Sequence, residues 1–316
     1  MIRVHLVGRY SRESIESFFQ VGQNAKSYFK IVNDINSADI VVSFDASGKT
    51  LLSDLSKRDL FKVLVRLEPM IVIPENYKRK NNKFFNLIVD VGKITDLTTN
   101  ALNWPQDLSA PNLVPANRSE RVVMVNSNLL SLQRRERYSL RRAAIKRIDR
   151  IDLYGHQWNQ NSKTKVLTLL RELKKFIVKP QFMKITGIKY YFRSYENFLG
   201  SVENKRLALA NYKYSLIIEN SNDYLSEKIF DSFLAGCVPI YVGPSLKNYL
   251  IPSELYFQAQ PNVKSIREQI SYARSVDYQK WVQNVGIWLT SPDTYQTWSR
   301  DLFAEKLETL IVKNYQ

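Results

Sequence analysis

The sequence predicts an α/β protein of two domains, each a parallel sheet covered by helices. Three observations carry this prediction. Short apolar runs alternate with amphipathic stretches, the alternation stops and later restarts, and a segment rich in proline, asparagine and serine separates the two series. A chain of 316 residues is long enough for two such cores. We expect Rossmann-like domains that face a central cleft, because ligands of these folds bind at the carboxyl ends of the strands.

The first series runs from the N-terminus to a linker at residues 100–119, and we assign residues 1–115 to an N-terminal domain. Its expected elements are strands at 2–7, 38–44 and 62–67 and helices at 12–20 and 52–59.

The second series defines a C-terminal domain of residues 116–316, with the packing of its last helix back on the N-terminal domain left open. Its expected elements are strands at 121–125, 151–154, 214–218 and 238–242 and helices at 139–149, 226–234, 263–273 and 294–311.

Composition narrows the class of protein. With 44% hydrophobic and 24% charged residues the chain is globular. No segment approaches the ~18 apolar residues of a membrane span, and the first strand is too short for a signal-peptide core, so we expect a cytoplasmic location. Cys237 is the only cysteine, which excludes a disulfide within the chain and fits a buried small residue. His5 and His156 are far apart, which argues against a His/Cys metal cluster.

The formal charge of +16 is concentrated in one region. Residues 134–196 hold 17 Lys/Arg against 5 Asp/Glu, which accounts for +12 of it. Such a region attracts nucleic acid, an anionic membrane surface or phosphorylated substrates, and solvated helix faces would give the same composition. No recognition pattern typical of nucleic-acid-binding proteins is present.

One motif resembles a phosphate-binding loop and fails the test. Residues 45–50 end in Gly-Lys-Thr, but the pattern needs a glycine where Ser43 stands. We interpret the segment as a polar turn between a strand and a helix.

The informative segment is Tyr212–Ser245, which predicts a strand, a polar loop, a helix, a tight turn and a strand. The loop 219–224 follows the first strand, and we expect the helix to begin near Ser226 as N-cap. A helix N-terminus has free N–H groups, and Lys228 adds a full charge, so the segment suits a phosphate.

The same segment resembles the donor-binding motif of the α-1,3-fucosyltransferases, glycosyltransferase family 10. The family pattern appears in order as Tyr-Lys-Tyr, Ile-Glu-Asn-Ser, Asp-Tyr-Leu-Ser-Glu-Lys, Ala-Gly-Cys-Val-Pro and Gly-Pro. Weaker similarity reaches upstream to Asn126-Ser-Asn128. The resemblance implies a GT-B-like fold, with GDP-fucose held mainly by the C-terminal domain and the acceptor by the N-terminal one. The lack of an N-terminal anchor resembles bacterial-type soluble members.

The resemblance also implies the residues that bind the donor. Asn220, Tyr224, Glu227 and Lys228 match family positions that hold the nucleotide and sugar, with Glu227 on hydroxyls and Lys228 on the departing diphosphate. Lys205 is expected to add to them.

The family further has an arginine that contacts the diphosphate from the helix after the Ser-Asn turn. Arg141 is the best match, and Arg137 and Arg142 remain open alternatives, because the length of the preceding loop is uncertain.

A transfer that inverts the anomeric carbon needs a carboxylate to take the acceptor proton. Glu68 ends a strand in Leu-Glu-Pro, where the family has its proposed base, and Phe85-Asn86 resembles a later part of the family pattern. We predict Glu68 as the catalytic base, with Glu75 as the alternative.

No Asp-x-Asp motif flanks the donor segment, so we predict catalysis without a metal or another cofactor, with basic side chains stabilising the leaving group. The expected partners are GDP-fucose and a glycan or glycolipid acceptor, such as a lipopolysaccharide sugar, with peripheral contact at the inner face of an anionic membrane and no nucleic acid. Two alternatives stay open: another nucleotide sugar as donor, or a basic nucleic-acid-binding protein.

Overall fold

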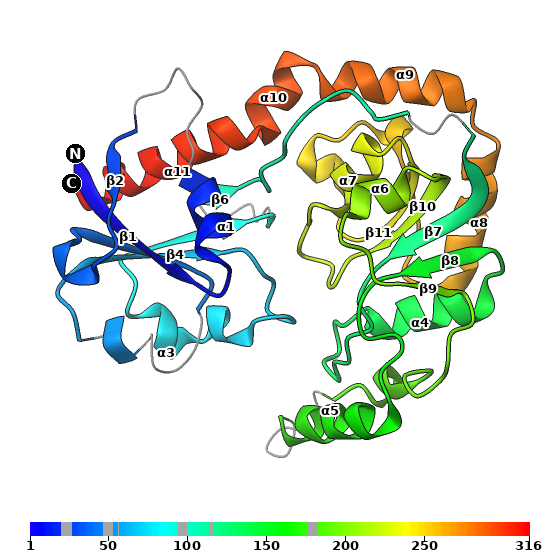
Figure 1. Ribbon diagram of the computed structural model, residues 1–316, viewed down its shortest axis with the longest axis horizontal. Coiled ribbons are helices and arrows are strands. Elements are labelled where there is room, and N and C mark those ends of the chain that lie inside the picture. Colours follow the sequence, from blue (N-terminus) through cyan, green and yellow to red (C-terminus); the bar gives the residue numbers. More distant parts are fainter. Residues whose placement is uncertain (20–26, 47–52, 56, 94–99, 114–116, 176–182) are drawn as a thin grey trace. The chain divides into compact units, whose positions relative to one another are not determined.

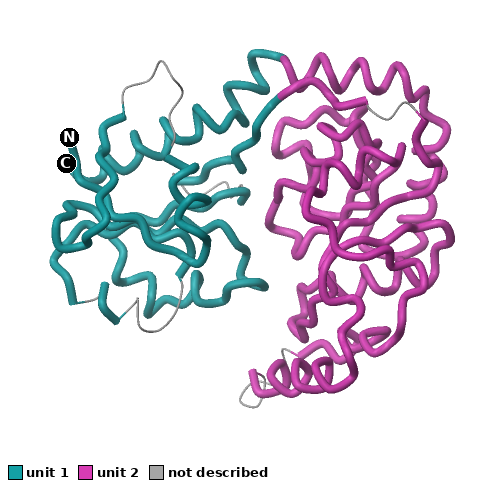
Figure 2. Tube along the Cα trace, viewed as in Figure 1, with its two compact units in different colours: residues 1–108, 291–316 teal, residues 109–290 magenta. Residues whose placement is uncertain are grey.

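The computed structural model describes residues 1–19, 27–46, 53–55, 57–93, 100–113, 117–175 and 183–316 (Figure 1). The chain divides into two compact units (Figure 2). Unit 1 comprises residues 1–108 and 291–316, and unit 2 comprises residues 109–290. The chain thus first passes from unit 1 to unit 2 inside the predicted linker, a few residues before the expected boundary at 115.

Unit 1 contains a parallel sheet with the order β2-β1-β3-β4-β5-β6. These strands are β1 (Ile2–Gly8), β2 (Phe29–Ile31), β3 (Ile40–Phe44), β4 (Phe61–Arg66), β5 (Leu87–Val91) and β6 (Ala101–Leu102). All five residues of β3 are buried, because a central parallel strand is covered on both faces and is therefore apolar throughout.

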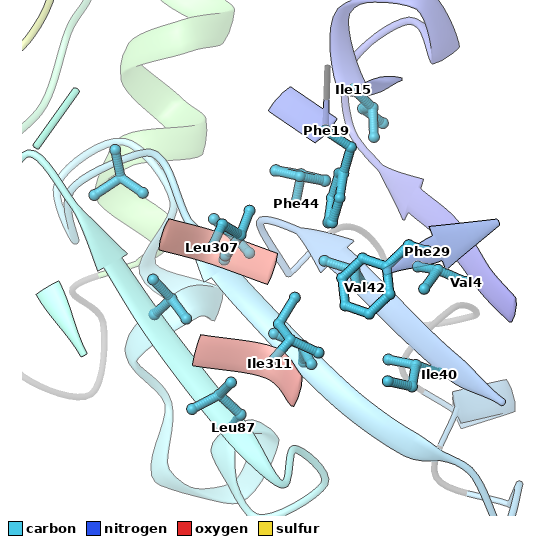
Figure 3. Packing of buried hydrophobic residues seen from close by; sticks show 14 of the residues in the cluster. Val4, Ile15, Phe19, Phe29, Ile40, Val42, Phe44, Leu87, Leu307 and Ile311 are labelled. Carbon is cyan, nitrogen blue, oxygen red and sulfur yellow. The ribbon is translucent and has the colours of Figure 1, made fainter. Parts of the chain in front are cut away.

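The last helix, α11 (Arg300–Tyr315), belongs to the core of unit 1. Phe303, Leu307 and Ile311 recur every fourth residue and so form one helix face, which is buried against strand residues such as Val42 and Phe44 (Figure 3). The sequence had grouped this segment with the C-terminal domain by continuity along the chain, whereas the structure groups it by packing.

The helix expected at 294–311 is interrupted. It consists of α10 (Pro292–Trp298) and α11, and Ser299 stands between them with extended backbone angles. The Ser299 side chain accepts the N–H of Leu302 and caps α11, so a residue that looked like the middle of one helix is a helix start.

Unit 2 contains a second parallel sheet, with the order β12-β11-β10-β7-β8-β9. These strands are β7 (Ser119–Val125), β8 (Ile151–Tyr154), β9 (Phe198–Gly200), β10 (Tyr212–Ile218), β11 (Val238–Val242) and β12 (Phe257–Gln258). Counted within the unit this is the order 3-2-1-4-5-6 of a Rossmann sheet, whose switch point lies between β7 and β10. In unit 1 the order reverses between β1 and β3.

Helices cover both sheets. In unit 1 they are α1 (Arg12–Glu16), η1 (Ser17–Phe19), η2 (Ile35–Ser37), η3 (Pro74–Tyr77), α3 (Arg79–Asn82), α10 and α11. In unit 2 they are α4 (Tyr138–Arg147), α5 (Ser162–Lys174), η5 (Ile185–Ile188), α6 (Lys205–Leu209), α7 (Lys228–Leu234), η6 (Leu246–Tyr249), η7 (Ser253–Leu255), α8 (Val263–Arg274) and α9 (Tyr278–Leu289). Within the described residues, none of the helices has the length and apolar character needed to cross a membrane.

Candidate functional site

Polar residues gather at the switch point of unit 2. Asn126 follows β7, and Glu219 and Asn220 follow β10. The backbone N–H of Glu219 donates to the carbonyl of Val242 at 2.9 Å, which ties the end of β10 to the end of β11. The polar loop predicted after this strand therefore lies where sheets of this kind bind ligands.

Glu219 organises the loop from beneath. Its carboxylate is fully buried and accepts the Ser226 hydroxyl at 2.8 Å, the Ser226 backbone N–H at 3.1 Å and the Lys228 ammonium at 3.4 Å. A buried carboxylate is tolerated when it is paired in this way. Glu219 was not selected from the sequence, although it is the acidic residue of the Glu-Asn-Ser motif and follows an apolar strand.

Two lysines from neighbouring helices lie at the same place. The Lys228 ammonium is 2.8 Å from the Ser226 hydroxyl, and the Lys205 ammonium is 2.7 Å from the Glu227 carboxylate. A small cavity of about 20 Å³, lined by Asn126, Lys205 and Lys228 among others, joins them to the end of β7. The predicted donor-binding residues Lys205, Glu227 and Lys228 are thus brought together.

Glu227 is held as a carboxylate. Burial opposes its ionisation, but the charges of Lys228 and Lys205 outweigh burial and lower the pKa of Glu227 to about 2. At neutral pH the residue is therefore an acceptor of hydrogen bonds. Sugar hydroxyls are donors of the matching kind.

The helix after the loop begins later than predicted. It starts at Lys228 with Glu227 as N-cap, and the Ser226 hydroxyl donates to Glu219 while its oxygen accepts the Lys228 N–H at 3.4 Å. The positive charge at this edge therefore comes mainly from the lysine side chains, since α7 is short.

Arg141, our first choice for the diphosphate contact, is fully buried and already engaged. Its guanidinium donates to the carbonyl of Ile218 at 3.1 Å and to the Asn220 side chain at 2.8 Å, and it lies over the Tyr138 ring. Arg141 thereby fixes the end of β10 and orients Asn220. Tyr224, also predicted for the donor, is buried in the same loop.

The three candidate arginines differ in their partners. Arg142 donates to Leu129 at 2.8 Å and to Asn128 at 3.2 Å, and it too is buried. Arg137 is 6% exposed, yet its Nη1 atom has no hydrogen-bond partner. Burial lowers the pKa of Arg137, and nearby Tyr241 and Glu219 act in the opposite direction. The geometry therefore favours Arg137 over Arg141 as the arginine with capacity for a ligand.

Further buried polar atoms without a partner lie in the same part of unit 2. They include the hydroxyls of Ser221 and Tyr241 and Oδ1 of Asn126. The Tyr241 hydroxyl lies against Gly243, where the Cβ of any other residue would collide with it. Unpaired buried polar groups are rare in folded proteins, so several on one sheet edge indicate a site that a ligand or water completes.

Glu68 lies in unit 1, two residues after the end of β4, and its side chain is half-buried. Its backbone N–H donates to Asp45 at 3.2 Å, and its carbonyl accepts the Tyr77 hydroxyl and the Asn76 amide, each at 3.3 Å. The predicted base thus sits on an anchored loop. Asp45 was not recognised from the sequence as part of this anchor, because its segment was interpreted only as a failed phosphate loop.

Asp45 is the centre of that anchor. It is fully buried at a positive φ of 61°, and it accepts the Tyr10 hydroxyl at 2.8 Å, the Asn76 amide at 2.6 Å and the Leu67 N–H at 2.8 Å. Burial raises the pKa of Asp45, although these hydrogen bonds act to lower it.

The other sequence candidates have ordinary surroundings. Glu75, the alternative base, is half-exposed and pairs with Lys78 at 2.8 Å on the surface. The Cys237 thiol is buried against the carbonyls of Leu209 and Tyr212, and burial raises its pKa to about 12, so it is no nucleophile. Across the part of the chain that the structure describes, no three His, Cys, Asp or Glu side chains group as metal ligands would.

Comparisons with known proteins agree with this picture. Residues 170–282 match the family model described as glycosyltransferase family 10 (fucosyltransferase), C-terminal. Over 82 residues the chain is 37% identical to 4-galactosyl-N-acetylglucosaminide 3-alpha-L-fucosyltransferase 9 of Mus musculus, which covers 24% of this chain and 23% of that protein. A putative fucosyltransferase-like protein of Arabidopsis thaliana is 36% identical over 94 residues, or 28% of this chain and 18% of the relative. The chain thus spans about a quarter or less of these relatives' length.

Similarity in structure extends much further than similarity in sequence. A solved α1,3-fucosyltransferase matches 100% of this chain and 92% of its own with a TM-score of 0.56 at 15% identity. Anabaena HepE in complex with UDP matches 99% and 100% with a TM-score of 0.57 at 11% identity. Both units therefore have the GT-B fold predicted for them, and residues 170–282 resemble the C-terminal domain of glycosyltransferase family 10.

Proposed function

We propose that this protein transfers L-fucose from GDP-fucose to a hydroxyl of a glycan acceptor, with inversion at the anomeric carbon. The observation that carries the proposal is the switch point of unit 2, where Lys205 and Lys228 line a small cavity with Asn126, and where Arg137 near Glu219 keeps a buried donor atom unpaired. The family supplies the class of reaction, and these residues supply a site for an anionic donor.

In this proposal the diphosphate is bound by basic side chains. Lys228 forms an ion pair with Glu219. Arg137 interacts electrostatically with the same carboxylate, and its Nη1 atom has no hydrogen-bond partner. Negative charge grows on the diphosphate as the sugar leaves, and fixed positive groups stabilise that charge most where water is excluded. We therefore assign the leaving-group role to Lys228 and Arg137, with Lys205 as the partner of Glu227.

The sugar and nucleotide contacts follow from the remaining groups. Glu227 is ionised and accepts hydrogen bonds, which suits the hydroxyls of fucose. Asn220 and Tyr224 are expected on the nucleotide side. Glu68 stays our prediction for the base.

The first test is calorimetric titration with GDP-fucose, GDP-mannose and UDP-galactose, each with and without chelator. We expect GDP-fucose alone to bind tightly, chelator to have no effect, and Lys228→Ala to weaken binding about tenfold or more, since it removes a charge-assisted contact. Lys247→Ala, a lysine of η6 in the same unit, is the matched control. Binding that disappears with chelator would end the prediction of metal-independent catalysis.

A different donor is the second candidate, because the fold resembles that of Anabaena HepE in complex with UDP as closely as that of the α1,3-fucosyltransferase. The same titration separates the two. If UDP-galactose binds more tightly than GDP-fucose, the proposed donor becomes a uridine nucleotide sugar, and the proposed contacts with the diphosphate stay the same.

The acceptor and the linkage belong to this proposal too. The mammalian relatives are named for transfer to position 3 of a 4-galactosyl-N-acetylglucosaminide, so that disaccharide is the first acceptor to test. A lipopolysaccharide sugar is a further acceptor in this hypothesis, and the proposed location of the protein is the cytoplasm. Product analysis by mass spectrometry and NMR would give the linkage and the anomeric configuration.

A further inference from the structure

Helix α5 presents an apolar stripe to solvent. Val166, Leu167, Leu170 and Leu173 are 45%, 46%, 50% and 36% exposed. Their spacing along the chain places them on one side of the helix. The helix is well formed, because the Asn161 side chain caps it by accepting the Thr164 N–H at 2.8 Å.

The inner face of the same helix is unusually polar. Lys165 and Glu172 are its buried residues, and Leu169 is the partly buried contact with a small cluster of Leu130, Leu132 and Tyr191. The Lys165 ammonium donates to the carbonyl of Arg193 at 3.4 Å. A helix of a globular protein normally turns its apolar side inward, so the orientation of α5 is reversed with respect to the usual pattern.

Basic residues are numerous on α5 and beside it. The exposed lysines and arginines on α5 and on the segment packed against it are Lys163, Arg171, Lys174, Lys175, Lys189 and Arg193. The only acidic residue in 162–193 is Glu172, which is buried and paired with Lys175. Figure 1 shows α5 at the periphery of unit 2, away from the sheet and from the helices α6 and α7 that carry the candidate site.

We propose that α5 is a membrane-docking helix that lies on a bilayer surface containing anionic phospholipid. An exposed apolar stripe bordered by lysine and arginine is the pattern of helices that lie in the interface, where the apolar side chains enter the acyl boundary and the cations meet lipid phosphates. The combination of positive charge and apolar side chains favours an anionic membrane over the other possible partners. A second copy of the chain would set like charges against each other, and a nucleic acid would use the cations but not the leucines. The inference does not depend on the proposed donor or reaction.

Co-sedimentation with vesicles tests the docking helix. Vesicles of phosphatidylcholine alone are compared with vesicles of phosphatidylcholine and phosphatidylglycerol, at low and high salt. We expect binding to the mixed vesicles only, weakened by salt because the charges are exposed. The double variant Leu167→Ser, Leu170→Ser should weaken binding about tenfold or more. The variant Lys163→Gln, Lys174→Gln should weaken it about fivefold per charge removed.

The matched control is Ile287→Ser on α9, an apolar residue that is 70% exposed and lies outside the basic region. Its vesicle binding should equal that of the wild type. All the altered side chains are exposed, so circular dichroism and melting should show unchanged folding.

Three results would overturn the proposal. One is equal binding to neutral and anionic vesicles. Another is a dimer in analytical ultracentrifugation that the serine variant dissociates, which would make the stripe a self-interface. The last is tight binding to a random oligonucleotide that depends on the lysines and is indifferent to the leucines.

Discussion

The two sheets gather polar groups at their switch points, but the two sets are in opposite states. In unit 1, Asp45 accepts four hydrogen bonds, which pair the donor groups that face it. In unit 2, Arg137, Ser221 and Tyr241 are equally buried and keep atoms without a partner. A satisfied network rigidifies the fold around it, whereas a partly satisfied one has capacity for a ligand. The polar network of unit 1 therefore fixes the loop that carries Glu68, whereas the polar groups of unit 2 have capacity to bind a ligand.

The largest expected effect separates chemistry from binding. Glu68→Gln removes the predicted base without touching unit 2, so kcat should fall about 10²–10⁴-fold. The Kd for GDP-fucose should stay unchanged in calorimetry. Glu75→Gln is the control, because that carboxylate pairs with Lys78 on the surface and should leave kcat near the wild-type value. If the two variants exchange these behaviours, Glu75 is the base.

The next effect tests whether the unit 1 network is structural. Asp45→Ala leaves the Asn76 amide and the N–H of Leu67 and Glu68 unpaired and puts alanine at a positive φ, so the free energy of unfolding should drop by about 3 kcal/mol. Asp45→Asn should restore most of it, because its amide oxygen can accept the same hydrogen bonds and asparagine tolerates this backbone. Urea unfolding measures both.

The pH dependence of the unfolding free energy should differ between the wild type and Asp45→Asn, and the direction of the shift in the Asp45 pKa gives the sign of this difference. Burial raises the pKa of Asp45 in the folded state, so ionisation costs stability, and this cost sets in as pH rises through the raised pKa. Asp45→Asn has no such titration. The wild type should therefore lose stability relative to this variant as pH rises from acid, and equal slopes would contradict a buried carboxylate at this position.

Arg137 tests the unit 2 side of the comparison. Arg137→Met should weaken GDP-fucose binding about tenfold to a hundredfold, the loss typical of one charge-assisted hydrogen bond, with little loss of stability because the fold gives its Nη1 no partner. Arg141→Met should do the reverse and destabilise the fold, since that guanidinium is engaged with Ile218 and Asn220. Arg135→Met, exposed on the same loop, is the control for charge alone.

Much of this architecture could be predicted from the sequence, and the failures have physical causes. The buried parallel strands β8 and β11 were predicted residue for residue, because short, largely apolar runs bounded by turn residues carry a strong signal. Helix α5 was not predicted, although its apolar residues recur at helical spacing, and which face of it is buried, the one with Lys165 and Glu172, depends on packing. Of the helix predicted at 52–59, residues 53–55 are helical and residues 57–59 are not, whereas residues 52 and 56 lie outside the described residues.

The site was predicted in part for a similar reason. The donor motif carries Lys228, Glu227 and Asn220 at fixed spacing, so their proximity follows from one strand, one loop and one helix. The choice among arginines depends on which guanidinium the fold has already satisfied, and this cannot be predicted from spacing. Asp45 acts through contacts with Tyr10 and Asn76, distant in the chain, for which a single sequence offers no signal.

The smallest expected effect refines the comparison at a paired group of the unit 2 site, the carboxylate of Glu227. The pKa of Glu227 is lowered to about 2, so its pairing with Lys205 stabilises the folded state above the unfolded-state pKa of about 4.3 and is lost as pH falls towards 2. Glu227→Gln should flatten the dependence of unfolding free energy on pH in this window, and Lys205→Met should flatten it too, by less than about 1 kcal/mol because the pair is partly exposed. If GDP-fucose also steepens the wild-type dependence but not that of Glu227→Gln, the carboxylate contacts the donor as well as the lysine. In unit 2 the hydrogen-bond acceptor Glu227 would then be positioned by its ion pair with Lys205, whereas the hydrogen-bond donor Arg137 has an atom without a partner in the fold.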